Sequence, residues 1–277
     1  MENYLKHSIE NLLIRTEYYK GYLFHLDSDL KNYTEILIDR LNKQKLNHNF
    51  IKGCRLIISD FTSKELNKKE YSPTKGYKVT KENYKDANKQ LIQFISCTLV
   101  AQSYEALETF IKDIIIQYFE NNNQIAFETI GKINCNWNKD IVDWGNTVRK
   151  INSGKNNSNY LNIIRRLSPD FRNAETNNNL NINLEQWFNV ISTIRHSITH
   201  SESILENNEL NKLKEDEFKI LELFIDLEDI GHGSKRMIIS KYQADELMTF
   251  ICNYSIQIFK WLTISLDFKW NLKELSK

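Results

Sequence analysis

The segment WFNVISTIRHSITHSES, Trp187–Ser203, is the one around which the rest of the chain is expected to fold. Its first half is apolar and begins with two aromatic residues, a pattern that predicts the buried face of an amphipathic helix. Its second half is polar and brings Arg195, His196 and His200 within about one and a half helical turns. Little else in the sequence groups titratable side chains so closely, so the functional hypothesis starts from these three residues.

The composition limits the class of protein. The 277 residues are 41% hydrophobic and 12% aromatic, which is enough for a sizeable core. With 37 basic and 36 acidic side chains the net charge is +1, and this argues against a non-specific coating of DNA while allowing a local basic groove. Only 2 prolines and 8 glycines indicate long helices rather than a β-sandwich rich in turns.

The cysteines and the hydrophobic segments point to the cytoplasm. Cys54, Cys97, Cys135 and Cys252 lie far apart without a CxxC or Cys/His cluster, so a zinc finger is not expected. The N-terminal MENYLKHSIENLL carries acidic residues and is amphipathic, unlike a signal peptide. No apolar run is long enough to cross a bilayer. We therefore expect a cytoplasmic protein without a membrane partner.

The N-terminal third predicts helices followed by a polar segment. Residues 2–26 show an apolar residue every three to four positions, and Asp27–Asp29 offers N-caps for a second helix that ends at about Gln44. Residues 50–61 fit a helix or a strand. Residues 62–83 are polar and contain a proline and a glycine, which favours a linker or a loop between layers.

Asn83–Glu120 is the longest periodic segment. A helix of over roughly thirty residues spans roughly 45–55 Å at about 1.5 Å per residue, so it is expected to form the spine of the fold. Its apolar stripe is Ile92, Ile95, Leu99, Tyr104, Leu107, Phe110, Ile111, Ile114 and Tyr118. Glu105 and Glu108 lie within this stripe. They are either ordinary solvated helix charges or carboxylates of which one orients the Arg195/His200 cluster from a facing helix.

Helices also dominate the C-terminal half. Short helices are predicted near 138–151 and 158–168. Asn183 is placed to cap a helix from Leu184 to about Thr199.

A hairpin is predicted between the last two helices. Residues 205–221 fit a highly charged helix. Residues 221–229 and 235–240 fit two strands joined by a turn at Gly231–Gly233. A final helix follows from Lys241 to Leu266, capped by Ser240.

The central stretch allows three chemical interpretations. His196 and His200 are four residues apart and share a helix face, so they could hold a metal ion, although no HExxH carboxylate or evident third ligand accompanies them. They could instead be structural residues near a helix end. The third interpretation is RNA cleavage without a metal, in which a histidine transfers protons to and from ribose oxygens. An arginine would then stabilise the charge on the transition state.

The helical spacing restricts the third interpretation. Arg195 and His200 are five residues apart, so their side chains point about 140° away from each other at about 100° per residue. One histidine also serves poorly as acid and base at once. Two chains that pair across a two-fold axis would ease both problems by bringing two motifs together.

Arg195–His200 resembles the RX4–6H motif of HEPN domains, the higher-eukaryote and prokaryote nucleotide-binding superfamily. His196 takes the polar position after the arginine. The order of helices is similar too: an earlier long helix carries a segment of the E-x-L-E-x-F type, Glu105–Phe110, and a final long helix follows the motif. The resemblance covers roughly 84–270. It does not extend to the first 80 residues or to the hairpin at about 221–240.

The resemblance implies a mainly α fold, an antiparallel helical bundle of HEPN type. The chain then divides into an N-terminal helical extension (1–62), a linker or loop (63–83) and a HEPN-like domain (84–270). The implied function is a homodimeric endoribonuclease without cofactors that acts as a toxin or phage-defence effector on RNA. A partner such as an antitoxin or a sensor could control it.

The resemblance also assigns roles to residues. Arg195 and His200 would be catalytic. His196 would orient this pair or contact phosphate, with Ser197 beside it, and Glu105 or Glu108 would support the site. The alternative is a non-catalytic helical module that binds nucleotide, RNA or a partner protein, because other HEPN proteins keep the fold without cleaving RNA.

Overall fold

The computed structural model describes residues 3–43, 50–54, 58–59, 69–71, 77–130, 143–151 and 158–271. Over these residues the protein is mainly helical with small antiparallel sheets, one of them three-stranded, which confirms the predicted mainly α class. The chain forms two compact units. One consists of Met1–Tyr22 together with Ser96–Lys277, and the other is Leu23–Ile95. This division does not test the predicted ranges 1–62, 63–83 and 84–270, which stay predictions.

The N-terminal segment forms one helix where the sequence predicted two. Helix α1 runs from Lys6 to Lys43. The expected cap at Asp27–Asp29 is wrong because Asp27 lies inside the helix, where its carboxylate accepts a hydrogen bond of 2.8 Å from Lys31 one turn later. No proline occurs in this range to end the helix, so the i to i+4 pairing continues through it.

The unit Leu23–Ile95 contains short strands between α1 and α2. These are β1 (Phe50–Cys54), β2 (Ile58–Ser59), β3 (Lys69–Tyr71) and β4 (Tyr77–Thr80). Strand β1 pairs antiparallel with β4, and β2 pairs antiparallel with β3.

These strands decide two of the sequence predictions. The described residues of 50–61 are strand, which was one of the two options. The prediction of a linker or loop over 62–83 is wrong for β3 and β4, because the backbone of β3 bonds to β2 and that of β4 bonds to β1. Residues 62–68 and 72–76 of that range lie outside the described residues.

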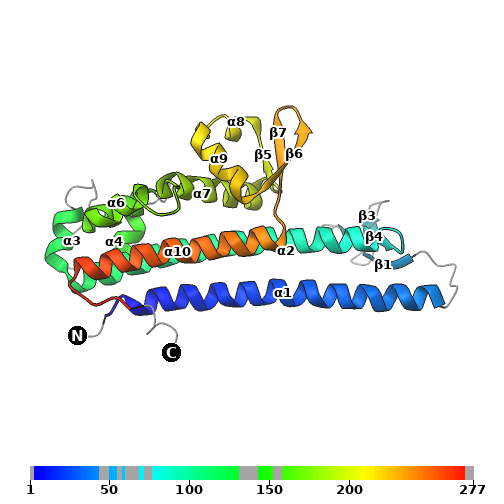
Figure 1. The fold of residues 1–277 in the computed structure, drawn as a ribbon, viewed down its shortest axis with the longest axis horizontal. Coiled ribbons are helices and arrows are strands. Elements are labelled where there is room, and N and C mark those ends of the chain that lie inside the picture. The colour runs from blue at the N-terminus through cyan, green and yellow to red at the C-terminus, as the bar shows by residue number, and fades with distance from the viewer. Residues whose placement is uncertain are drawn as a thin grey trace. The chain divides into compact units, whose positions relative to one another are not determined.

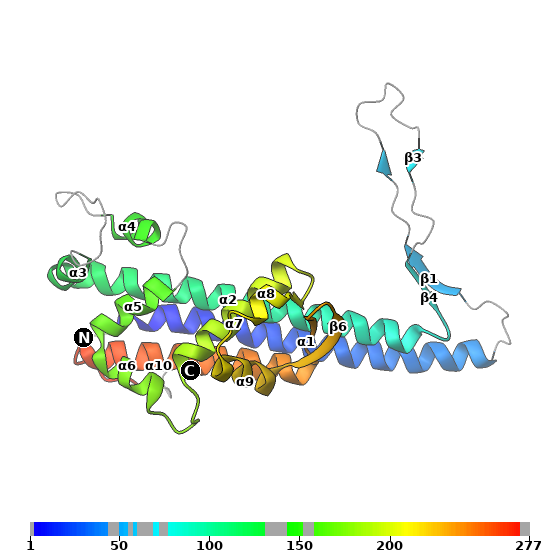
Figure 2. The same ribbon diagram turned by 90° about the horizontal axis from the view of Figure 1, so that it is seen from above.

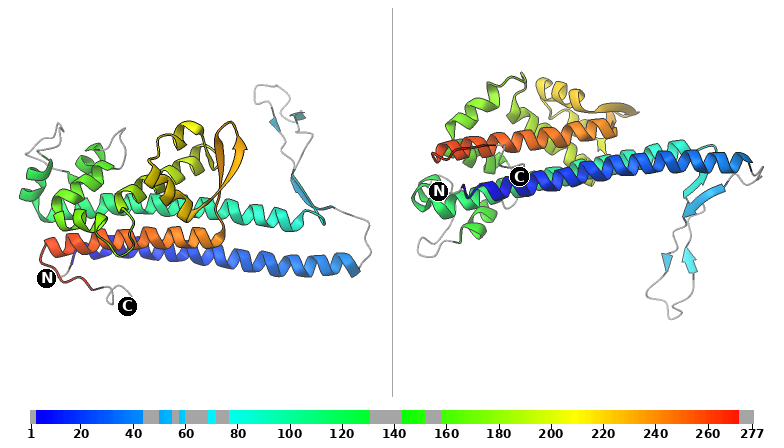
Figure 3. Two further views of the ribbon diagram at one scale, coloured as in Figure 1. Left: turned by 45° about the horizontal axis from the view of Figure 1, so that its top comes forward. Right: turned by 60° about the horizontal axis from the view of Figure 1, so that its bottom comes forward.

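Long helices form the base of the other unit. Helix α2 (Tyr84–Asn121) confirms the predicted spine, and α10 (Lys241–Ser265) confirms the predicted last helix with its Ser240 cap. The part of α1 before residue 22, the later part of α2 and α10 lie side by side (Figures 1 and 3). Lys20 of α1 bridges to Asp245 of α10 at 2.8 Å. None of the helices within the described ranges has the length and hydropathy needed to cross a bilayer.

Shorter helices follow α2. They are α3 (Asn123–Ile130), α4 (Trp144–Ile151), α5 (Ser158–Leu167), α6 (Pro169–Thr176) and α7 (Leu184–His200). Helices α4 and α5 confirm the short helices predicted near 138–151 and 158–168, except that 138–142 lie outside the described residues. Helix α6 was not predicted, although Ser168 followed by a proline is a typical helix start.

Aromatic side chains hold α7 in the core. The fully buried Trp187 ring lies 4.6 Å from that of Phe250 and 5.3 Å from that of Tyr254, both on α10. Phe188 packs against Tyr104 of α2 at 5.9 Å between ring centroids. The aromatic start of the central stretch therefore fixes α7 on the two long helices, and Figure 2 shows α7 lying over α2.

A small substructure covers the outer side of α7. It consists of β5 (Ile204–Leu205), α8 (Asn207–Leu210), α9 (Glu215–Phe224), β6 (Asp226–Gly231) and β7 (Ser234–Ile238). The predicted hairpin is present as β6 and β7, but its proposed first residues, 221–224, belong to α9. The single charged helix predicted over 205–221 is also wrong. That segment starts in β5, which pairs with β7, and two separate helices follow.

Candidate functional site

The site is built on the last two turns of α7. Asn183 caps the start of the helix by accepting hydrogen bonds from the backbone N–H groups of Glu185 and Gln186, as the sequence predicted. The helix ends after His200 because Glu202 and Ser203 adopt φ values of 52° and 65°, a left-handed conformation that cannot continue a helix. The Ser203 N–H then bonds to the Ser197 carbonyl at 3.0 Å. His200 is therefore the last helical residue.

Ser197 lies on the buried side of α7. It is fully buried, and its hydroxyl has no hydrogen-bond partner among the described residues. The expectation that Ser197 helps to bind phosphate therefore does not fit its position. The apolar spacing could have indicated this, because Val190, Ile194 and Ser197 follow one another on the buried face at intervals of four and three residues.

Arg195 points toward α2 and pairs with Glu105. Its Nη2 donates to Oε1 of Glu105 at 3.1 Å, and the two side chains are 28% and 41% exposed. Its Nε is buried and has no acceptor among the described residues. The contact between one α2 carboxylate and the arginine, which the sequence suggested, is thus present. The catalytic meaning of this contact stays a prediction.

Glu108 lies one turn further along α2 and is half-buried. Burial raises the pKa of its carboxyl above the ordinary value of 4.5, and the charge of Glu105 acts in the same direction. Lys112 and Arg195 oppose this rise in pKa through their positive charges. Glu105 and Glu108 therefore differ in setting: Glu105 holds the guanidinium directly, whereas Glu108 is a partly desolvated neighbour.

His196 and His200 lie together on the outer side of the helix end. Their ring centroids are 4.7 Å apart, and His196 Nε2 lies 3.8 Å from Oε1 of Glu209 on α8. Both histidines are exposed. In the described part of the chain no hydrogen bond joins Arg195 to His200. Within one chain the motif therefore forms two pairs, Arg195 with Glu105 and His196 with His200.

The pair of histidines also bears on the metal interpretation. Over the described ranges, no group of three or more His, Cys, Asp and Glu side chains has an arrangement that could hold a metal ion.

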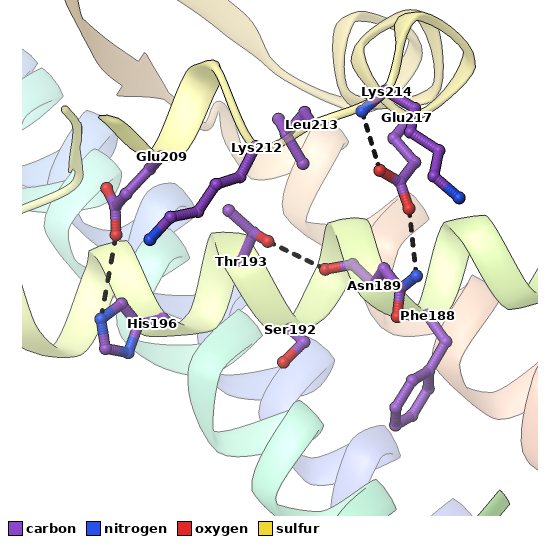
Figure 4. Close-up of a pocket in the computed structure, with 10 residues that line it drawn as sticks. All are labelled: Phe188, Asn189, Ser192, Thr193, His196, Glu209, Lys212, Leu213, Lys214 and Glu217. Atoms are coloured by element: carbon purple, nitrogen blue, oxygen red, sulfur yellow. Dashed lines mark hydrogen bonds and ion pairs between the residues drawn. The ribbon is translucent and has the colours of Figure 1, made fainter. Parts of the chain in front are cut away.

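A pocket of about 610 Å³ opens beside His196, between α7 and the segment from α8 to α9. Figure 4 shows its lining side chains, with Lys212 reaching over α7 between Glu209 and Thr193. The lining residues are Phe188, Asn189, Ser192, Thr193, His196, Glu209, Lys212, Leu213, Lys214 and Glu217. Sequence reasoning missed this pocket. The break between α8 and α9 creates it, and the charged sequence around Lys212 carries no proline or glycine to indicate the break.

Comparison with models of known protein families, with characterised proteins and with solved structures gives no match to this chain.

Proposed function

We propose that the protein is a metal-independent endoribonuclease similar to the HEPN type, with Arg195 and His200 as its catalytic residues. The observation that carries the proposal is the arrangement at the end of α7. Two exposed imidazoles lie 4.7 Å apart there, and the adjacent arginine is held by Glu105 at 3.1 Å. An imidazole can accept and donate a proton, and the guanidinium offers positive charge beside the two rings.

The proposed reaction is attack by a ribose 2′-hydroxyl on the neighbouring phosphorus. A neutral imidazole takes the proton of the 2′-OH, and the 2′-oxygen forms a bond to phosphorus. The bond from phosphorus to the 5′-oxygen then breaks, and an imidazolium returns a proton to that oxygen. The products are a 2′,3′-cyclic phosphate and a 5′-hydroxyl. Arg195 would stabilise the extra negative charge on the transition state.

Pairing of two chains completes this proposal. Within one chain Arg195 faces Glu105 while the histidines lie on another side of the helix end, so a single motif does not surround a phosphate. A two-fold axis near His200 would place the histidines of one chain opposite the arginine of the other. The acid and the base could then lie on opposite sides of the scissile bond. We therefore propose a homodimer, with single-stranded or looped RNA as the substrate because it reaches in-line geometry readily.

The biological role that follows is growth arrest through RNA damage, as in a toxin or a phage-defence effector, with an antitoxin or a sensor partner to control it. Induced expression of the wild type should stop bacterial growth and fragment total RNA, whereas His200→Ala should do neither. His25→Ala is the matched control, because His25 is also an exposed histidine on a helix. Arrest and RNA fragmentation by His200→Ala at wild-type level would overturn the proposal.

A second candidate function is a non-catalytic module that binds RNA, nucleotide or a partner protein. The observation that favours it is the ion pair itself, since Glu105 occupies part of the Arg195 guanidinium. Incubation of the purified protein with bulk RNA in EDTA separates the two functions. Cleavage supports the nuclease, and tight RNA or nucleotide binding without cleavage supports the module.

A further inference from the structure

The pocket beside His196 carries a lysine that no carboxylate neutralises. Among the described residues Lys212 makes no ion pair, although Glu209 and Glu217 line the same pocket. Its ammonium extends into the space above α7 in Figure 4. Lys212 is exposed, and an ammonium without an ion-pair partner in the lining of a concave site can form a charge-assisted hydrogen bond with an anionic ligand.

The two carboxylates of the pocket already accept hydrogen bonds from groups of the protein. Glu217 is 5% exposed, and its two oxygens accept hydrogen bonds from the Asn189 amide at 3.0 Å and the Lys214 backbone N–H at 2.9 Å. Glu209 accepts a bond from the Glu206 backbone N–H at 3.1 Å and approaches His196 with its other oxygen. Both carboxylates are thus oriented toward other donors and neither forms an ion pair with Lys212, so its ammonium can meet a ligand.

The rest of the pocket suits the non-ionic part of a nucleotide. Leu213 supplies apolar surface, with the almost fully buried Phe188 (3% exposed) at the edge of the lining, and Ser192 supplies a hydroxyl that makes no hydrogen bond to a described residue. A volume of about 610 Å³ falls within the usual range for small-ligand sites. An anionic ligand with a flat, partly apolar group would therefore meet complementary chemistry at both ends of the pocket.

We infer that this pocket binds one nucleotide of a single-stranded RNA, next to the phosphate presented to His196 and His200. Lys212 contacts the backbone phosphate of this nucleotide, and its base enters the space above Ser192. That this RNA is also the substrate of cleavage rests on the proposed function. The binding of RNA in the pocket does not depend on that function. The pocket thus holds the strand so that its phosphate lies at a fixed distance from the two histidines.

Binding of an RNA that cannot be cleaved tests the inference separately from catalysis. The probe is a labelled ten-nucleotide RNA of mixed sequence with 2′-O-methyl groups, which lacks the attacking hydroxyl. Fluorescence anisotropy would measure its Kd at several salt concentrations. Lys212→Ala should weaken binding roughly tenfold, the effect of one charge-assisted contact. The slope of log K against log salt should fall by about 0.7.

A second variant separates a pocket from a charged surface. Ser192→Phe leaves the charge unchanged but fills the space, so it should also weaken binding several-fold without a change in the salt slope. The control is Lys219→Ala, which removes a lysine of α9 that is 62% exposed and paired with Glu215. Unchanged binding by Lys212→Ala or by Ser192→Phe would overturn the inference, as would an equal loss in Lys219→Ala.

The same variants keep the two proposals distinguishable. The wild type could cleave ordinary RNA while Lys212→Ala and Ser192→Phe bind the probe as the wild type does. This result would overturn RNA binding in the pocket and support the proposed nuclease. Both variants could instead bind the probe more weakly while the wild type cleaves no RNA. This result would overturn the proposed nuclease and support an RNA-binding pocket.

Discussion

The pairs Arg165–Glu175 and Arg195–Glu105 join the same two residue types but differ in burial. Arg165 and Glu175 are 9% and 2% exposed, and the guanidinium donates two hydrogen bonds to the carboxylate, at 2.6 and 2.9 Å. Tyr254 adds a third bond to Glu175 at 3.0 Å. Arg195 and Glu105 are 28% and 41% exposed and share one bond of 3.1 Å.

The difference separates a structural pair from a candidate functional one. Arg165 needs Glu175 because a buried guanidinium without its carboxylate is strongly destabilised. Arg195 is exposed enough to remain hydrated without Glu105, so its pairing contributes little to folding. An arginine that is oriented by one contact and still accessible can meet a phosphate, whereas Arg165 cannot.

Removal of the buried carboxylate gives the largest expected effect. Glu175→Ala leaves the Arg165 charge without its buried carboxylate and the Tyr254 hydroxyl without its acceptor, so the free energy of unfolding should fall by about 3–5 kcal/mol. Urea denaturation would measure the change. Glu185→Ala is the control, because Glu185 also approaches Arg165, at 3.3 Å, but is 58% exposed. A similar small loss in both variants would remove the distinction between the two pairs.

Removal of the exposed carboxylate should change activity more than stability. Glu105→Gln is expected to lower the free energy of unfolding by less than about 1 kcal/mol. Cleavage of RNA should fall roughly tenfold, because the Arg195 guanidinium loses its orienting charge. Both quantities would be compared with those of Glu120→Gln, an exposed position on the same helix. Wild-type cleavage by Glu105→Gln would show that the pair does not position the arginine.

Glu108 gives a pH-dependent test of the same region. Because burial raises the pKa of Glu108 above 4.5, the folded state binds its proton more tightly than the unfolded state does. The stability from this proton is complete below pH 4.5 and is lost as the pH rises through the raised pKa. Lys112, Arg195, Glu105 and Tyr104 surround the group.

Glu108→Gln removes this titration. Its Tm should therefore rise relative to that of the wild type as the pH increases from about 4 to 7. Thermal unfolding at several pH values would measure the difference. Parallel Tm curves for the two proteins would contradict a raised pKa at Glu108.

Ser197→Ala should have the smallest effect. The Ser197 hydroxyl is buried without a partner among the described residues, so its loss should change the free energy of unfolding by less than about 0.5 kcal/mol. Cleavage should stay at the wild-type rate. Ser255→Ala should cost more stability, because that buried hydroxyl donates to the Ile251 carbonyl at 2.8 Å. Loss of RNA cleavage in Ser197→Ala would contradict this expectation and show that Ser197 takes part in the site.

Much of the helical framework follows from local signals. The apolar period of α2, the Asn183 cap of α7 and the Ser240 cap of α10 are each contained in a few neighbouring residues. Asp27 misled the prediction because an acidic residue that bonds to Lys31 within a helix has the same sequence as a cap. Strands β3 and β4 were not predicted, since residues 62–83 are polar and show no apolar alternation that would indicate a strand, and pairing with β2 and β1 is what orders their backbone.

The candidate site was predictable in part. The helix period places His196 and His200 on one face, and the apolar surroundings of Glu105 suggested its contact with α7. The burial of Ser197 follows from the same period, but its polar neighbours concealed it. Lys212 and Glu209 join the site only because α8 folds back over α7, and no spacing rule within α7 contains that information.

The sharpest test of the proposed nuclease is cleavage of RNA by purified protein in EDTA, with analysis of the new ends. The wild type should produce fragments with 2′,3′-cyclic phosphate and 5′-hydroxyl ends, and His200→Ala and Arg195→Ala should produce none while keeping the wild-type circular dichroism spectrum. His25→Ala should cleave like the wild type. Undiminished cleavage by His200→Ala, or no cleavage by a folded, dimeric wild type on any RNA tested, would contradict the proposal.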